Sequence, residues 1–198
     1  MKNINITQEQ CETALKLAQH SIKHHPVSDI YKNDGPDSNG VQGEQLSLER
    51  RFRGTLGEII YADYYGFERP KKSFGAVDGQ DNGRDFSSPI EPTKSVDVKT
   101  MRRTSPVIRP YYVANLENRQ VSKKDSLTDL YFVITVVGKT GDFHPKEAIL
   151  NGYISPNELK EKATFYPAGS QVTNDWGKVI NHPRDTYEIE FKYLHEPW

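Results

Sequence analysis

The sequence predicts a single α/β domain, in which a mixed central sheet is flanked by helices. Two segments, 7–24 and 44–65, have the apolar spacing of amphipathic helices. Residues 84–101 are typical of a β-hairpin, and residues 129–138 form a nearly continuous apolar run rich in β-branched side chains. Because these segments follow one another without a domain-scale linker, we expect one domain that spans residues 1–198.

The first expected helix covers residues 7–24. Thr7 and Gln10 have the spacing of a capping box, which satisfies the free backbone donors at a helix start. The apolar positions of this helix are Cys11, Ala14, Leu15, Ala18 and Ile22. Residues 25–43 are rich in Pro, Gly, Asp, Asn and Ser, which predicts a loop.

The second expected helix covers residues 44–65, and Gly66 is a natural C-terminal stop. Its apolar stripe consists of Leu48, Phe52, Leu56, Ile59, Ile60 and Tyr64. Glu58 projects at the flank of this stripe, from which a side chain can reach over the edge of a sheet. Asp63 projects into the middle of the stripe, and we interpret it as a structural acid that needs a polar partner.

The rest of the chain is predicted to complete the sheet. Residues 129–138 are expected to form a central strand that is buried on both faces. Ser155 to Glu158 have the pattern of a capped helix start with proline at the first helical position. The other expected elements are strands at 111–114, 148–154 and 186–194 and a short helix at 156–163. The catalytic core would then span residues 44–165 or so.

Composition limits the classes of function. The net charge is −1, so the chain lacks the global basic field of many nucleic-acid-binding proteins, although an acidic metal site would offset a local basic groove in that sum. The single cysteine excludes an internal disulfide, and the polar N-terminus lacks the apolar region of a signal peptide. No apolar run approaches membrane-spanning length. We expect a cytoplasmic protein without a membrane partner.

The predicted hairpin carries the residues with the most chemical information. Side chains alternate between the faces of a strand, so Asp97 and Lys99 share one face, and Asp85 on the paired strand can reach the same place. Two acids and a lysine gathered on one face are costly unless a divalent cation bridges the carboxylates. A surface hairpin with a cross-strand ion pair is the alternative explanation of these residues.

With Glu58 added, the chain resembles the PD-(D/E)XK nuclease superfamily, whose members have the restriction-endonuclease-like fold. The residues that carry the resemblance are Gly57-Glu58, Asp85 and Asp97-Val98-Lys99. The apolar strand at 129–137 and the strand-to-helix step at 152–156 are also similar to that fold, and the helix with Glu58 is similar to that of archaeal Holliday-junction resolvases. The resemblance covers roughly residues 50–165. One position departs from the pattern, because Arg84 stands where the superfamily name has proline.

The resemblance implies a metal-dependent hydrolysis of phosphodiester bonds. Asp85 and Asp97 would bind Mg²⁺, for which Mn²⁺ can substitute, with the backbone carbonyl of Val98 as a further ligand. Glu58 would complete the acidic cluster or hold a second metal. Lys99 would position the attacking water or stabilise the pentavalent phosphorane, and the metal-activated water would attack in line.

Basic residues near these acids predict a phosphate-binding rim. Arg102 and Arg103 follow the strand that carries Lys99, and Arg53 precedes Glu58 on the helix. Taken singly, each is explained as well by a solvated surface charge. The other basic residues considered for this rim are Arg50, Arg51, Lys71, Lys72, Lys123 and Lys124.

The sequence therefore predicts a Mg²⁺-dependent DNA endonuclease. It leaves open a type II restriction-like homodimer and a structure-specific nuclease, whose recognition elements would lie at 25–43 and 102–128. A non-catalytic nucleic-acid or protein-binding module on the same fold is the alternative from another class, and a hydrolase of small phosphoesters is a more distant one. His20 and His24 are four residues apart on a helix, but no third metal ligand accompanies them, so a solvated helix end explains them better.

Overall fold

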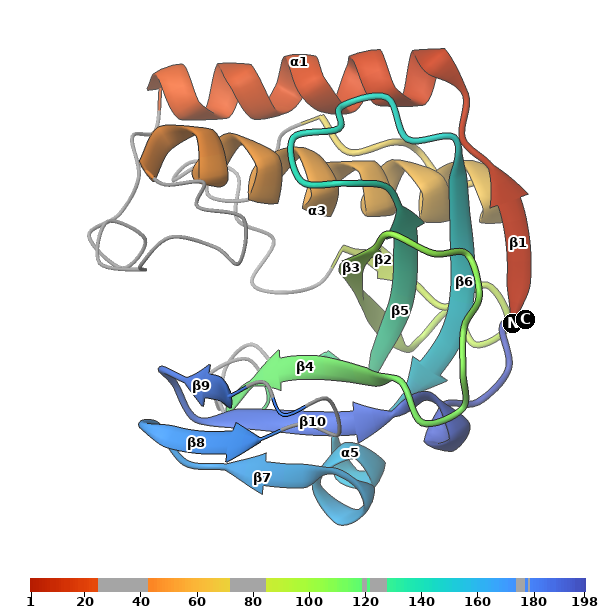
Figure 1. Ribbon diagram of the computed structural model, residues 1–198. Helices are drawn as coiled ribbons and strands as arrows, with labels where there is room; N and C mark the ends of the chain where they lie inside the picture. Colours follow the sequence, from red (N-terminus) through yellow and green to blue (C-terminus); the bar gives the residue numbers. More distant parts are fainter. Residues whose placement is uncertain (25–42, 72–84, 119–120, 122–127, 174–176, 178) are drawn as a thin grey trace.

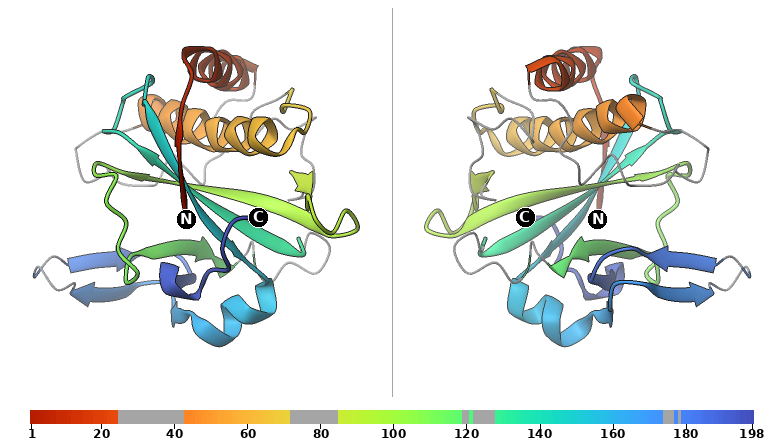
Figure 2. Two further views of the ribbon diagram at one scale, coloured as in Figure 1. Left: turned by 90° about the vertical axis from the view of Figure 1, so that its right-hand side faces the viewer. Right: turned by 90° about the vertical axis from the view of Figure 1, so that its left-hand side faces the viewer.

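The computed structural model describes residues 1–24, 43–71, 85–118, 121, 128–173, 177 and 179–198. Almost all of the predicted loop at 25–43 lies outside these residues, as does Arg84. Figures 1 and 2 show three layers, with two helices on one side of a twisted sheet and a second, smaller group of strands on its other side. No helix in the described part of the chain combines the length and apolar character needed to cross a membrane.

Both long helices predicted from the sequence are present. Helix α1 spans Gln8–His24 and helix α3 spans Gly43–Tyr65. The capping box of α1 is confirmed, because the Thr7 N–H donates to Gln10 Oε1 over 2.9 Å and the Gln10 N–H donates to Thr7 Oγ1 over 3.2 Å. Gly66 ends α3 with a φ of 76°, a conformation that favours glycine.

The principal sheet, here called sheet A, has the strand order β1-β6-β5-β3-β2. Its strands are β1 Lys2–Asn5, β2 Phe86–Ser87, β3 Ser95–Arg103, β5 Leu130–Val137 and β6 Glu147–Ile154. Strands β3 and β5 are parallel and the other neighbours are antiparallel, so the sheet is mixed. The predicted hairpin is confirmed as the β2–β3 pair, and β5 is buried on both faces as expected.

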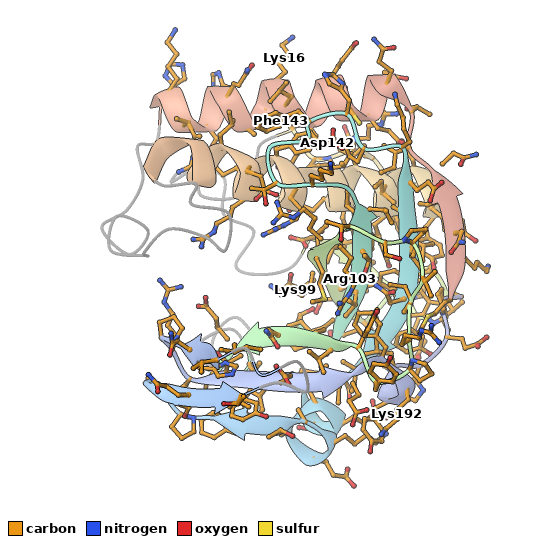
Figure 3. All side chains as sticks on the ribbon, viewed as in Figure 1. Lys16, Lys99, Arg103, Asp142, Phe143 and Lys192 are labelled. Carbon is orange, nitrogen blue, oxygen red and sulfur yellow. The ribbon has the colours of Figure 1, made fainter. Side chains whose placement is uncertain are left out.

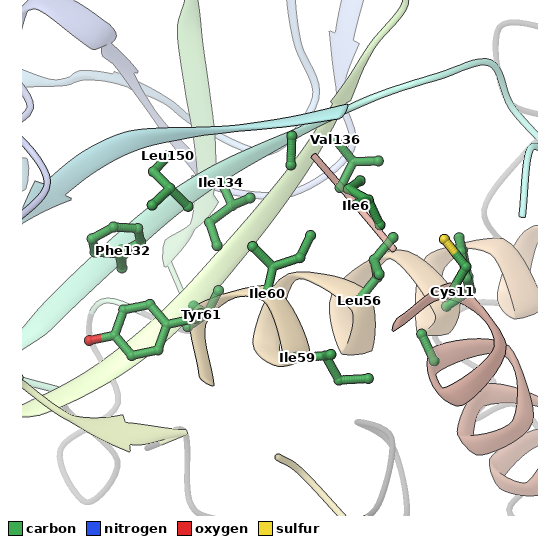
Figure 4. Close-up of a cluster of buried hydrophobic side chains, with 14 of the residues drawn as sticks. Ile6, Cys11, Leu56, Ile59, Ile60, Tyr61, Phe132, Ile134, Val136 and Leu150 are labelled. Carbon is green, nitrogen blue, oxygen red and sulfur yellow. The ribbon is translucent and has the colours of Figure 1, made fainter. Parts of the chain in front are cut away.

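The helical layer covers one face of sheet A. Apolar side chains from α1, α3 and the strands form a common core there, including Leu56, Ile60, Phe132 and Ile134 (Figure 4). Alternation along β3 places Val96 and Val98 in this core. The residues between them on the strand therefore face the other way, away from the helices.

A three-stranded sheet, here called sheet B, covers the opposite face of sheet A. Its strands in order are β4 Val113–Glu117, β10 Thr186–Glu190 and β7 Thr164–Tyr166. The remaining elements are α5 Pro156–Lys162, the hairpin of β8 Ser170–Thr173 and β9 Val179–His182, and the 3₁₀ turn η1 Phe191–Tyr193. Tyr131 and Val133 of β5 pack with Leu116 and Ile189 in a second core between the sheets.

Several predicted boundaries and side-chain positions differ in the structure. The strand expected at 186–194 ends at Glu190, because residues 191–193 turn into η1, and the strand expected at 111–114 begins at Val113. Tyr64 is 38% exposed rather than buried. Helix α3 packs against α1 as well as the sheet, so its buried surface is broader than one stripe. Near its end, Tyr61 rather than Tyr64 is the tyrosine buried in the core.

Asp63 was predicted to lie in the middle of the apolar stripe, and this position is wrong. It lies on the exposed side of α3, where Oδ1 is 2.6 Å from Arg69 Nε and Oδ2 accepts a hydrogen bond of 2.7 Å from Gln10. The structural role is confirmed, because these contacts join α3 to α1 and to the segment that follows α3.

Candidate functional site

Asp97 and Lys99 form an ion pair on the face of β3 that is turned toward sheet B. Lys99 Nζ lies 2.7 Å from Asp97 Oδ2, and the two side chains are 20% and 11% exposed. Figure 3 shows Lys99 at the level between the helical layer and β4. The strand alternation expected from the sequence is thus confirmed for this pair. A carboxylate this deeply placed remains charged at low cost only with a cationic partner, which Lys99 supplies.

Tyr131 on the neighbouring strand forms the floor beneath this ion pair. It is the register partner of Asp97 in the parallel β3–β5 ladder and is fully buried. Lys99 Nζ lies 5.8 Å from the centroid of the Tyr131 ring, within the range of a cation–π contact. Burial and then the negative charge of Asp97 raise the pKa of the Tyr131 phenol well above its usual value, so the phenol stays neutral.

Asp85 lies at the edge of β3 rather than on the face that carries Asp97. Its N–H donates to the Val96 carbonyl over 2.9 Å, and its Oδ2 accepts a hydrogen bond of 2.7 Å from the Val98 N–H. Strand β2 is only two residues long, so the Asp85 side chain takes the place of a backbone acceptor for Val98. The N–H and the C=O of one strand residue point to the same edge, so the Val98 carbonyl points to the edge at which the Asp85 carboxylate lies.

Glu58 approaches β3 from the helical side. The preceding residue, Gly57, lies against Thr100, and a Cβ at Gly57 would be only 1.8 Å from Thr100 Oγ1. The close contact sets α3 directly on β3 and leaves Glu58 half-buried beside it. Four predicted site residues therefore surround one strand from three directions: Glu58 from the helix, Asp85 from the edge, and Asp97 with Lys99 from the opposite face.

The described side chains do not form a three-ligand metal group. Among them, no three His, Cys, Asp or Glu residues are gathered closely enough to hold a metal ion together. The Val98 carbonyl belongs to the main chain and is not counted in such a group. The structure thus joins Asp97 with Lys99 and Asp85 with the Val98 backbone, and the metal site stays a prediction.

Arg102 and Arg103, predicted as neighbouring phosphate contacts, lie on opposite faces because both belong to β3. Arg102 faces α3, where its Nη1 is 3.0 Å from Glu49 Oε1. Arg103 faces sheet B, donates to the Val113 carbonyl over 3.1 Å and lies 4.2 Å from the Tyr112 ring centroid. Burial lowers the pKa of Arg103, although Tyr112 opposes this. Arg103 therefore braces sheet B against sheet A, and its role in the phosphate rim stays a prediction.

The other basic residues contribute less to the site. Arg51 is buried and donates a hydrogen bond to Ser21 Oγ of α1, and Lys71 forms an exposed ion pair of 2.8 Å with Glu68. Lys72, Lys123 and Lys124 lie outside the described residues. His20 and His24 are exposed near the end of α1, with ring centroids 4.3 Å apart.

Sequence reasoning missed two residues of this region, Tyr131 and Glu49. Tyr131 stands within the apolar run of β5, where the sequence predicts only a buried strand, and its register opposite Asp97 appears only once β3 and β5 are paired in parallel. Glu49 is an ordinary helix glutamate in the sequence, and only the packing of α3 on β3 brings it to Arg102.

Comparison with known proteins does not extend this description. No protein-family model, no curated protein and no solved structure matches the chain. The functional conclusion therefore depends on the arrangement of the side chains around β3.

Proposed function

We propose that this protein is a Mg²⁺-dependent DNA endonuclease with a restriction-endonuclease-like fold. One observation carries the proposal: Asp97 and Lys99 are paired on one face of β3, while the Asp85 carboxylate lies at the strand edge to which the Val98 carbonyl points. The α/β architecture agrees with it, since a helix with Gly57 and Glu58, an antiparallel hairpin and a parallel central strand occur in the expected order.

The donor set around β3 suits a hard divalent cation. Asp85, Asp97 and the Val98 carbonyl supply oxygen ligands only, which is the chemistry that Mg²⁺ and Mn²⁺ prefer. Glu58, on the helical side of β3, would hold a second metal ion. When bound, such an ion would neutralise charge on a phosphate and lower the pKa of a water molecule.

During hydrolysis, side chains of the protein would orient the attacking water and balance the negative charge that develops on the phosphate. Lys99 carries an ammonium group on a face where Asp97 and the Tyr131 ring restrict its motion. From there it would orient the attacking water or balance negative charge on the phosphorane as the leaving oxygen departs in line. Asp85 would hold the strand edge in register through its bond to the Val98 N–H.

A non-catalytic binding module is the second candidate, and the same ion pair favours it. Asp97 and Lys99 neutralise each other at 2.7 Å without a metal ion, so their burial does not by itself require catalysis. A module of this kind would bind nucleic acid or protein equally well with or without a divalent cation. A nuclease would lose its activity when the cation is removed.

Cleavage assays on three DNA substrates would test the proposal. Supercoiled plasmid, single-stranded DNA and a branched junction are incubated with Mg²⁺ or Mn²⁺, beside an EDTA control. We expect the parent to cleave at least one substrate and Asp97→Asn and Lys99→Gln to lose about 10²-fold or more of the rate. The matched control is Lys16→Gln, which removes an exposed lysine of α1 and should leave the rate unchanged. A folded parent that cleaves none of the substrates with either metal would refute the nuclease assignment.

A further inference from the structure

Two arginines share a single buried acid where the first half of α3 packs against the end of β3. Arg102 Nη1 lies 3.0 Å and Arg53 Nη1 lies 3.6 Å from the same oxygen, Glu49 Oε1. The Glu49 side chain is only 5% exposed, whereas the side chains of Arg53 and Arg102 are 26% and 20% exposed. We call these three residues the shared-acid arginine pair. The acid is thus enclosed, and both guanidinium groups retain access to solvent.

The shared-acid arginine pair carries an excess of positive charge. The carboxylate of Glu49 offsets the charge of one of the two guanidinium groups, so the net charge of the three residues is +1. The pKa of Arg53 is lowered, chiefly by burial; Glu49 opposes this change, while the positive charges of Arg102 and Arg50 add to it. Like charges are therefore held near one another in partly dry surroundings. An anion bound between the two arginines would relieve their repulsion, and planar guanidinium groups suit the oxygens of a phosphate.

The pair lies on the helix–strand seam that also holds Gly57 and Glu58, on the opposite face of β3 from Asp97 and Lys99. Gly57 rests on Thr100. Arg53 lies one turn earlier along α3 and Glu49 two turns earlier, where Glu49 meets Arg102, two residues further along β3. At a rise of about 3.3 Å per residue, Arg102 is about 13 Å along the strand from Val98. A nucleic-acid strand rises about 3.4 Å per nucleotide, so this distance is about four nucleotides.

We infer that Arg53 and Arg102, held in place by Glu49, bind a backbone phosphate of the nucleic-acid strand a few nucleotides from the bond that is cut. Glu49 is a positioning residue that fixes both guanidinium groups before the ligand arrives. The identity of the ligand as nucleic acid rests on the proposed function. The anion site itself rests only on the geometry and charge of these three residues.

DNA binding can be measured apart from cleavage when Ca²⁺ replaces Mg²⁺. Ca²⁺ occupies oxygen sites but is expected not to support cleavage, so the affinity for a DNA duplex is measured in its presence. We expect Arg53→Gln and Arg102→Gln each to reduce the slope of log affinity against log salt by about 1, because one phosphate contact is lost. Between 50 and 200 mM salt, this is a difference of about threefold to fourfold. The variants Arg53→Lys and Arg102→Lys keep the charge and should largely keep the slope. Lys160→Gln, at an exposed lysine of α5, is the matched control and should bind as the parent does.

Titration with inorganic phosphate tests the anion site without DNA. The side-chain Nε–H signals of Arg53 and Arg102 should shift together on adding phosphate, and that of Arg69, whose Nε is paired with Asp63, should not. A protein that shows this response but cleaves no DNA would refute the nuclease while leaving the anion site in place. A protein that cleaves DNA but shows no phosphate response and unchanged salt slopes in both glutamine variants would overturn the inference alone.

Discussion

Gly57 of α3 and Thr100 of β3 are in such close contact that a methyl group on Gly57 would lie 1.8 Å from Thr100 Oγ1 and 2.9 Å from Thr100 Cβ. The contact determines how deeply α3 rests on sheet A. Because Glu58 follows Gly57 directly, the same contact fixes where the helix presents this carboxylate relative to the hairpin.

Gly57→Ala should therefore destabilise the fold although alanine favours helices. The gain in helix propensity is about 1 kcal/mol. Thr100 is β-branched and stiff, so the helix must move away from the strand, and overpacking of this kind costs about 1–3 kcal/mol or more. We expect a net loss of about 1–2 kcal/mol in the free energy of unfolding, measured by urea denaturation.

A second substitution checks the cause of this loss. Thr100→Ala removes the nearest atom, so the double variant Gly57→Ala, Thr100→Ala should recover part of the stability that the single changes lose. Strict additivity of the two changes would show that the contact between these residues is not the cause.

Asp85 should tolerate an amide for folding but not for metal binding. In Asp85→Asn, the side-chain carbonyl can still accept the hydrogen bond from the Val98 N–H, so the fold should lose less than 1 kcal/mol. In Asp85→Ala, the Val98 N–H loses its acceptor, at a cost of about 1–3 kcal/mol. Both variants should bind Mn²⁺ at least tenfold more weakly than the parent in calorimetric titrations. If Asp85→Asn binds Mn²⁺ as tightly as the parent does, Asp85 is not a metal ligand.

The aromatic ring of Tyr131 should stabilise the ammonium group of Lys99. Tyr131→Phe keeps a ring beneath the ammonium group and Tyr131→Leu does not. A cation–π contact of this depth is worth about 1–2 kcal/mol, so the leucine variant should lose about tenfold in single-turnover cleavage and the phenylalanine variant distinctly less. Nuclear magnetic resonance provides a check that does not need activity: ring-current shifts of the Lys99 methylene protons should persist in Tyr131→Phe and vanish in Tyr131→Leu. Equal shifts in both variants would contradict the contact.

Glu158 should make stability depend on pH at the acid end. Burial alone would raise its pKa, but hydrogen bonds from His195 over 2.7 Å and from Ser155 over 2.8 Å lower it to about 2. A carboxyl whose pKa is lower in the folded state stabilises the fold above its unfolded pKa, near 4.5, and this contribution is lost as the pH falls from 4.5 toward 2.

Urea denaturation of Glu158→Gln between pH 7 and pH 2 would measure this contribution. We expect the variant to be less stable than the parent at pH 7 by about 1 kcal/mol, a figure reduced for a side chain that is 30% exposed. The difference should shrink as the pH falls to 2. Glu161→Gln, at an exposed position of the same helix, is the matched control and should follow the parent at every pH.

Most strands of sheet A and both long helices can be predicted from the sequence, because their apolar residues recur with the period of a strand or a helix. Asp97 and Lys99 were placed on one face by alternation alone, and the Thr7 and Ser155 caps were identified from their spacing. Strand β1 was missed because Lys-Asn-Ile-Asn is short and polar, and it becomes a strand only by pairing with β6. Strands β7, β8 and β9 were missed for a similar reason, since three or four half-exposed residues show no period above that of a loop.

Long-range packing decides the parts of the site that sequence reasoning could not reach. Arg102 and Arg103 are neighbours in the sequence, but β3 continues through both residues, so alternation places their side chains on opposite faces of the strand. Glu49 is paired with Arg102 across 53 positions of sequence, a relationship that no local pattern contains.

The pairing of β1 with β6 has a consequence for how the chain acquires its fold during synthesis. Lys2 pairs with Leu150, so the first strand stays without its partner until nearly 150 further residues have been made. At about 5–20 residues per second, the ribosome needs roughly 7–30 s for this stretch. Closing such a long loop is slow, so the nascent chain should pass through a state in which α1 and α3 are already formed while an edge of sheet A is still open. During that interval the open edge is the part of the molecule that a chaperone, or a second nascent chain, would meet first.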